Sequence, residues 1–235
     1  MARRANSMTS RRPRTDGFTL VELLIVLALV AILAAFAIPS LLGARLSADE
    51  AGAIGTLRSI AAAQAAFRGD RRVNRNGNEE GEYGYFAEMS QRIAPRAAAS
   101  VIPAPYLPGA FRTVSGGVIT RSGYVFRMVL PGPGGLPAPE ALLGGEDPMI
   151  PVEDLMAESI WVAYAWPAVN GSTGERVFCI TNDGDILWQD NSATNYSGLT
   201  TPCPPDAAFT QPNDILSPRA QKAAGNDGAT WYPLR

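Results

Sequence analysis

Residues 17–46 read GFTLVELLIVLALVAILAAFAIPSLLGARL, and this stretch decides how the chain is organised. Between Phe18 and Leu42 almost every residue is apolar, and a helix of about 20 such residues crosses the hydrocarbon core of a bilayer. Glu22 is the only ionisable residue in this run. Residues 1–16 hold five arginines and one aspartate, and this excess of positive charge favours a cytoplasmic N-terminus. The sequence therefore predicts a single-pass membrane helix, with the rest of the chain exported.

Glu22 lies in the predicted membrane helix, where inserting a carboxylate costs free energy. Insertion scales place an acid at the centre of a membrane helix at about 2.5–3.5 kcal/mol, and near the helix end the cost is lower. A carboxylate at this place is a functional candidate, and we expect it to have a charged partner. The residues at 17–22, the basic leader before them and Pro39 after them resemble the N-terminus of type IV pilin and type II secretion pseudopilin precursors. The close resemblance covers about residues 11–46.

In that family a membrane-embedded prepilin peptidase cuts after a glycine and methylates the new N-terminus. The resemblance implies cleavage between Gly17 and Phe18 and N-methylation of Phe18. It also implies that Glu22 attracts the Phe18 ammonium of a neighbouring subunit, and opposite charges do attract strongly at low dielectric while relieving each other's desolvation. Pro39 lacks a backbone N–H, so we expect it to kink the helix or open it locally.

The resemblance further implies a structural subunit of a type IV pilus or of a type II secretion pseudopilus. Such a subunit spans the bacterial inner membrane once before it joins a filament, with its N-terminus cytoplasmic and its head periplasmic or extracellular. Its partners would be the prepilin peptidase, other pilin or pseudopilin subunits, the inner-membrane assembly platform and the lipid bilayer. The sequence does not separate pilus from pseudopilus, a major from a minor subunit, or Met1 from Met8 as the start.

Other interpretations of the N-terminus stay open. An ordinary secretory signal has a basic start, a short apolar region and a small-residue cleavage site, and residues 35–37, AFA, would serve as that site. The longer apolar run and Glu22 inside it argue against this signal. A plain membrane anchor would not need Gly17 or Glu22 where they stand. Residues 11–12 could begin a twin-arginine signal, but Pro-Arg-Thr follows where apolar residues are expected. The alternative function is a monomeric membrane-anchored or exported binding protein.

After Leu42 the pattern changes from all apolar to one-sided. Apolar residues then recur at spacings of three and four, which is typical of an amphipathic helix; they include Leu46, Ala53, Ile54, Leu57, Ile60, Ala61 and Phe67, with Gln64 in the same stripe. We divide the chain into a leader (1–17), the transmembrane half of a long helix (18–42), its amphipathic half (43–68), a polar and Pro-rich connector (69–120), an antiparallel sheet head (121–190) and an irregular C-terminal tail (191–235).

Short apolar segments separated by turns predict an antiparallel meander in the head. We expect strands over 123–130, 160–166, 176–181 and 185–188, with 118–121 as a further candidate, and a Pro/Gly loop over 131–139 that cannot join a ladder. After the long helix and the polar loop that follows it, we expect a short helix that ends near residue 93. The apolar face of the sheet would cover the amphipathic half of the long helix. The predicted fold is α+β and pilin-like.

Two cysteines in an exported chain suggest one disulfide, Cys179–Cys203, which would tie the tail to the sheet. Many pilins use a C-terminal disulfide in this way, and two buried free thiols are the alternative. Resemblance to major pseudopilins suggests a calcium site at Asp183, Asp185 and Asp190. However, a tight turn at Asp183-Gly184 already explains the first of these residues. We therefore expect no metal or cofactor, with calcium at these three aspartates as the alternative.

Composition disfavours several function classes. The chain has 235 residues and no histidine, so the commonest general base and metal ligand are missing. We expect acid pairs such as Glu79-Glu80 to lie on the solvated surface. The sequence has no phosphate-binding glycine loop between a predicted strand and a predicted helix. Without its leader the chain has a formal net charge of −6, which argues against non-specific binding of nucleic acid. The residue types and motifs of the chain therefore disfavour a catalytic function.

Overall fold

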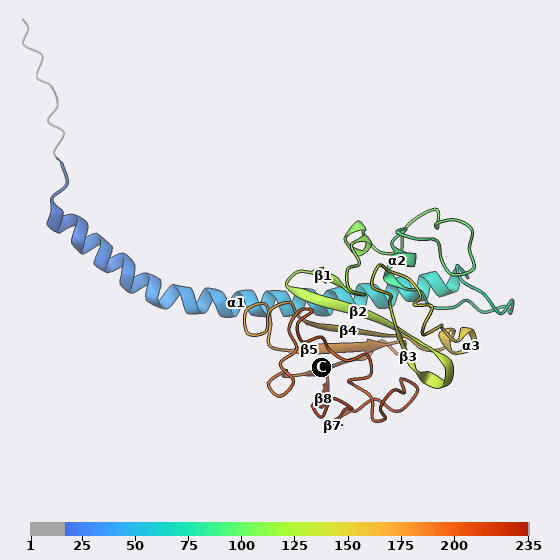
Figure 1. The fold of residues 1–235 in the computed structure, drawn as a ribbon. Coiled ribbons are helices and arrows are strands. Elements are labelled where there is room, and N and C mark those ends of the chain that lie inside the picture. The colour runs from blue at the N-terminus through green and yellow to red at the C-terminus, as the bar shows by residue number, and fades with distance from the viewer. Residues whose placement is uncertain (1–16, 235) are drawn as a thin grey trace, which may run out of the picture. The chain divides into compact units, whose positions relative to one another are not determined.

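The structure is a computed structural model that describes residues 17–234. The arginine-rich leader and the choice between Met1 and Met8 lie outside the described residues. The chain divides between Leu42 and Gly43 into two compact units, and α1 (Leu20–Gly69) has residues in both. The elements are labelled in Figure 1.

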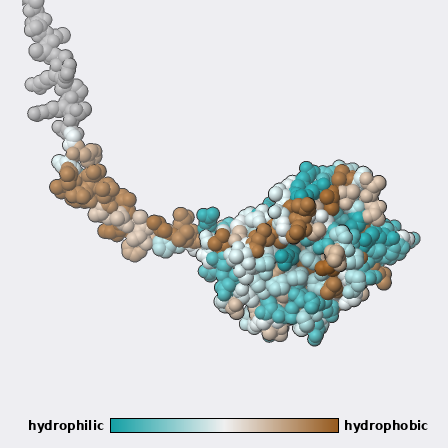
Figure 2. All heavy atoms as spheres, in the orientation of Figure 1, coloured by the Kyte–Doolittle hydropathy of each residue, from teal (hydrophilic) through white to brown (hydrophobic). Residues whose placement is uncertain are grey.

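In the first unit α1 exposes apolar side chains on all sides. An 18-residue window of this helix has a mean hydropathy of 3.0 and none of it is buried, so its length and composition suffice to cross a membrane. Figure 2 shows this part of α1 as an almost continuous hydrophobic surface. A helix that is apolar all round needs a bilayer or other helices around it. The helical conformation is continuous through Pro39.

In the second unit α1 is one-sided, as its sequence predicts. Leu57, Ile60 and Phe67 have no exposed surface, whereas Arg58 and Ala62 between them are exposed. This spacing of three and four places the apolar residues on one face of the helix, and that face packs on the sheet. The prediction of an amphipathic second half packed on an antiparallel sheet is confirmed.

The sheet is antiparallel in every pairing, with the strand order β1-β2-β4-β5-β6-β8-β7 and with β3 paired to β2. Its strands are β1 (Ile119–Arg121), β2 (Tyr124–Pro131), β3 (Pro137–Pro139), β4 (Val162–Pro167), β5 (Val177–Thr181), β6 (Ile186–Gln189), β7 (Ala223–Ala224) and β8 (Thr230–Pro233). The short helices are α2 (Phe86–Met89), η1 (Gly109–Arg112), η2 (Pro133–Gly135) and α3 (Asp154–Ala157). The four expected strands and the candidate at 118–121 are all present, within two residues of their predicted bounds.

Three predictions about the head are wrong. Residues 137–139 do join the ladder, since β3 pairs with β2 alone and an edge strand tolerates prolines. The tail is not wholly irregular, because β8 pairs with β6 and β7 with β8. The short helix ends at Met89 instead of near residue 93, and Gln91 adopts a left-handed φ of 64°, which an α-helix cannot continue through.

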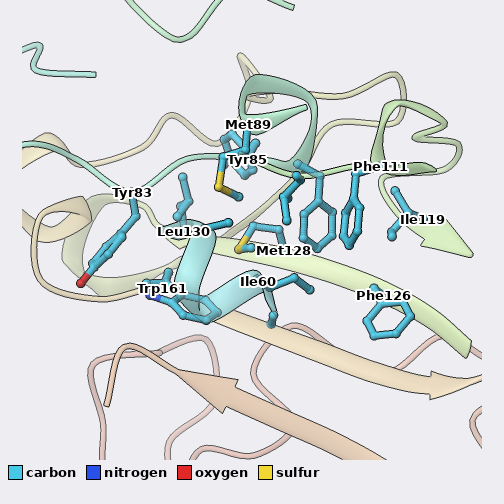
Figure 3. Packing of buried hydrophobic residues seen from close by; sticks show 14 of the residues in the cluster. Ile60, Tyr83, Tyr85, Met89, Phe111, Ile119, Phe126, Met128, Leu130 and Trp161 are labelled. Carbon is cyan, nitrogen blue, oxygen red and sulfur yellow. The ribbon is translucent and has the colours of Figure 1, made fainter. Parts of the chain in front are cut away.

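The head has two hydrophobic cores, one on each face of the sheet. The first lies between the sheet, α1 and the connector, and Figure 3 shows part of it, with Ile60 from α1 and Phe126 and Met128 from β2. The second lies between the opposite face and the C-terminal tail, and it includes Tyr164 and Trp231. Since Trp231 belongs to β8 and has no exposed surface, the tail is an integral layer of the head.

Candidate assembly site at the start of the long helix

Thr19 and Glu22 close the N-terminal end of α1. The backbone N–H of Thr19 donates to Glu22 Oε2 over 3.1 Å, and the backbone N–H of Glu22 donates to Thr19 Oγ1 over 3.2 Å. The Thr19 hydroxyl also donates to Glu22 Oε2, over 3.0 Å. This reciprocal pattern is a capping box, in which two backbone donors that the helix leaves free are satisfied by side chains. The Glu22 carboxylate is thereby held in a defined place on the first turn.

Thr19 is not among the site residues predicted from the sequence. The signal was present, because Thr-x-x-Glu directly before an apolar run is the sequence signature of this cap. Glu22 was predicted to act only through its charge, and its role in the helix cap was missed. Within residues 17–234 Glu22 forms no ion pair, and its carboxylate remains exposed.

Gly17 and Phe18 precede the helix in extended, non-helical backbone. Phe18 has 85% of its surface exposed, and a Cβ added at Gly17 would meet no atom within 4 Å. The bond between these two residues is therefore accessible, and it lies only one residue before the capping box. The predicted cleavage and assembly residues Gly17, Phe18 and Glu22 thus lie together at one end of α1, while Pro39 lies several turns further along.

Beyond this cap the helix presents large exposed apolar side chains. Leu20, Leu33 and Phe36 each have 70% or more of their surface exposed, and most neighbouring apolar residues exceed one half. Burying such side chains fully is worth about 1.5–3 kcal/mol each. The segment can therefore associate with lipid or with other apolar helices.

The model of the prokaryotic N-terminal methylation motif matches residues 12–38. The chain is also 34% identical over 88 residues to the type IV major pilin protein PilA of Myxococcus xanthus (strain DK1622), a match that covers 37% of this chain. The chain thus carries a prokaryotic N-terminal methylation motif and is similar over part of its length to a type IV major pilin. The match spans only 39% of the length of that relative. No solved structure matches the chain.

The two cysteines of the chain lie in the second core. Cys179 and Cys203 are both fully buried, and both are free thiols in the structure, so their pairing stays a prediction. Burial raises the pKa of the Cys179 thiol to about 12, and burial raises that of Cys203 as well. Buried neutral thiols of this kind are poor nucleophiles, which fits a structural role.

Two of the three aspartates considered for calcium already have protein partners for their side chains. Asp183 accepts a hydrogen bond from the Thr181 hydroxyl over 2.9 Å and pairs with Arg219. Asp190 accepts from the Ser192 hydroxyl over 2.9 Å. Across residues 17–234, no group of three or more acidic or cysteine side chains is placed to hold a metal ion.

Proposed function

We propose that this chain is a structural subunit of a type IV pilus or of a type II secretion pseudopilus. The observation that carries the proposal is the combination at the start of α1: an accessible Gly17–Phe18 bond, a carboxylate fixed on the first turn, and an apolar helix surface behind it. The methylation motif over 12–38 supports it. The matched relative is by its name a major pilin, which favours a pilus over a pseudopilus.

Processing is the first step of the proposed mechanism. The prepilin peptidase cleaves after Gly17 and methylates the amine of Phe18. A glycine at this place lets an enzyme approach the backbone closely, since no side chain intervenes. The processed subunit stays in the inner membrane through residues 18–42, with the head periplasmic, until the assembly platform adds it to a filament.

Assembly is the second step, and Glu22 directs it. The Phe18 ammonium of one subunit enters an apolar helix bundle and needs a counter-charge there. Glu22 of the neighbouring subunit supplies this charge from the first turn of its helix. At an effective dielectric constant of about 20, two unit charges 4 Å apart attract by about 4 kcal/mol. The attraction therefore sets the axial register of each added subunit.

The capping box prepares Glu22 for this contact. Thr19 donates to Oε2, and among the described residues no hydrogen bond occupies the other oxygen. Because the side chain is already ordered, less rotamer entropy is lost when an ammonium binds. The same bonds satisfy backbone groups that would otherwise face hydrocarbon, where an unpaired polar group is expensive.

The test compares two fractions of native cells, sheared filaments and membranes, for the wild type and for Glu22 variants. We expect the wild type in filaments. Glu22→Ala should be processed and membrane-bound but poorly incorporated, since a broken buried pair costs about 3–5 kcal/mol. Glu22→Asp should partly recover. Wild-type protein that stays monomeric in the membrane would instead favour the alternative, a membrane-anchored binding protein.

A further inference from the structure

One row of side chains crosses the sheet on the face that carries α1. Residues directly opposite each other in an antiparallel sheet lie on the same face. The pairings connect six such residues across β1, β2, β4, β5, β6 and β8, namely Ile119, Phe126, Ala165, Phe178, Trp188 and Tyr232. The first four are buried, Trp188 is half-buried and Tyr232 is 44% exposed. The row therefore becomes exposed at its β6 and β8 members.

The last two members of the row, Trp188 and Tyr232, form an aromatic pair. The Trp188 and Tyr232 rings have centroids 5.5 Å apart and planes inclined by 36°. The Arg176 guanidinium lies 5.5 Å from the Trp188 ring, and Glu50 of α1 holds this arginine through a 2.7 Å hydrogen bond. Trp188 is thus fixed from one side, and the pair presents a preformed apolar surface.

Two hollows adjoin this pair. One of about 460 Å³ is lined by Trp188, Lys222, Tyr232 and Pro233. A second of about 270 Å³ shares Tyr232 and is otherwise lined by Asp190, Ser192, Ala193, Gly228, Ala229 and Thr230. The first is within the usual size range of ligand sites, about 300–1,000 Å³. The two hollows differ in chemistry, since one is aromatic and cationic and the other is polar.

The positive charge of Lys222 favours an anionic ligand. It is the only lysine in the chain, it is exposed, and among residues 17–234 it forms no ion pair. An ammonium beside aromatic rings would pair with a carboxylate and leave the rings to an apolar surface of the same ligand. Hydroxyl and carboxylate groups in the second hollow suit a ligand with several hydroxyls.

We propose that the two hollows bind adjacent rings of an acidic polysaccharide. The C–H-rich face of one uronic acid ring packs on Tyr232 and Trp188, with its carboxylate on Lys222. The hydroxyls of the next ring bond with Asp190, Ser192 and Thr230. The mature chain has a net charge of −6, but at physiological ionic strength exposed charges beyond about 8 Å are largely screened. Lys222 therefore sets the charge of the first hollow, whereas Asp190 in the second hollow requires the next ring to face it with hydroxyl groups and not with its carboxylate.

The experiment measures binding of the full chain, purified in detergent, to polygalacturonate and to its fully methyl-esterified form. The two polymers share one backbone and differ only in charge. We expect polygalacturonate to bind more tightly. Tyr232→Ala should weaken binding by about tenfold, as expected when an aromatic contact worth about 1.5 kcal/mol is lost, and Tyr232→Phe should retain it. Lys222→Gln should remove the preference for the acidic polymer, and Lys222→Arg should keep it.

Urea unfolding of each variant is the folding control, and we expect unchanged midpoints because Tyr232 and Lys222 lie at the surface. Absence of binding to polygalacturonate by the folded wild type would overturn the proposal. So would equal binding by wild type and Tyr232→Ala, or tighter binding of the methyl ester. Self-association of the chain that Tyr232→Ala abolishes, without polymer binding, would assign this surface to a second copy instead.

Discussion

The side chains of Thr19 and Glu22 hydrogen-bond each other's backbone N–H groups across the first turn of α1. This relationship gives Glu22 two roles that substitutions can separate. As a cap it needs only an acceptor oxygen, which glutamine also provides. As a counter-charge to the Phe18 ammonium it needs a negative charge, which glutamine lacks.

Glu22→Gln should therefore be processed and inserted into the membrane, but incorporated into filaments as poorly as Glu22→Ala. Thr19→Val, which removes the hydroxyl and keeps the charge, should weaken the helix start by about 0.5–2 kcal/mol and reduce incorporation less. The measurement is the ratio of the sheared-filament fraction to the membrane fraction. Normal incorporation of Glu22→Gln would leave capping as the only role of this residue.

A second prediction concerns Gln64, the polar member of the apolar stripe. It is fully buried, its amide donates to the Gly84 carbonyl over 2.8 Å, and its carbonyl accepts from the Gly84 N–H over 2.9 Å. Gln64→Leu leaves two buried backbone groups unpaired, at about 1–3 kcal/mol each. We expect a clearly lower urea midpoint for the full chain. Ala62→Gln, on the exposed face of the same helix, is the matched control and should change little.

Gly84 offers an independent check of the same contact. A Cβ at this position would lie 2.7 Å from the Phe67 ring, which is itself fully buried. Gly84→Ala should therefore destabilise the head by about 1–3 kcal/mol through overpacking. An unchanged urea midpoint would mean that α1 and the segment after it are not packed as described.

A third prediction concerns pH. Glu140 is 3% exposed and accepts hydrogen bonds from the N–H groups of Phe86, Ala87 and Gly145, yet its burial raises its pKa to about 8. The native state therefore keeps this proton to a higher pH than the unfolded chain, which loses it near 4.5. Stability from this group is present below about pH 4.5 and is lost as the pH rises towards 8.

The free energy of unfolding should accordingly fall between about pH 5 and 8. Burial also raises the pKa of Glu82 and of Asp227, so these groups contribute with the same sign. Glu140→Gln cannot titrate and should reduce the slope while lowering stability at acidic pH. Urea denaturation at several pH values measures this slope, and an unchanged slope in the variant would contradict the account of Glu140.

A fourth prediction concerns the cysteines of protein taken from native cells. Cys179 and Cys203 lie in the same core, and a bond between them would close a loop of about 25 residues, worth about 3 kcal/mol in the chain-entropy model. Since both thiols are buried, labelling must be done in denaturant. We expect no alkylation before reduction and two labels after it. Full labelling of both thiols without reduction would show that the bond does not form.

The sequence predicted the elements whose signals are local. The spacing of Leu57, Ile60 and Phe67 specified the buried face of α1, and turn residues separated the central strands. It did not predict β8, since Thr230–Pro233 pairs with β6 about 40 residues earlier and follows a polar, Pro-rich segment. Long-range pairing of this kind leaves little local pattern. At β3 a local signal was present but gave the wrong prediction. Its prolines predicted a loop, whereas an edge strand accepts proline.

The central claim, that the chain is a processed filament subunit, predicts one N-terminus. Mass spectrometry of protein from native membranes should find a mature chain that begins with N-methylated Phe18. Gly17→Val should remain unprocessed, because a β-branched side chain would occupy the space that the peptidase needs. An N-terminus at Ile38 in the wild type would contradict the account, since it would identify residues 1–37 as an ordinary secretory signal.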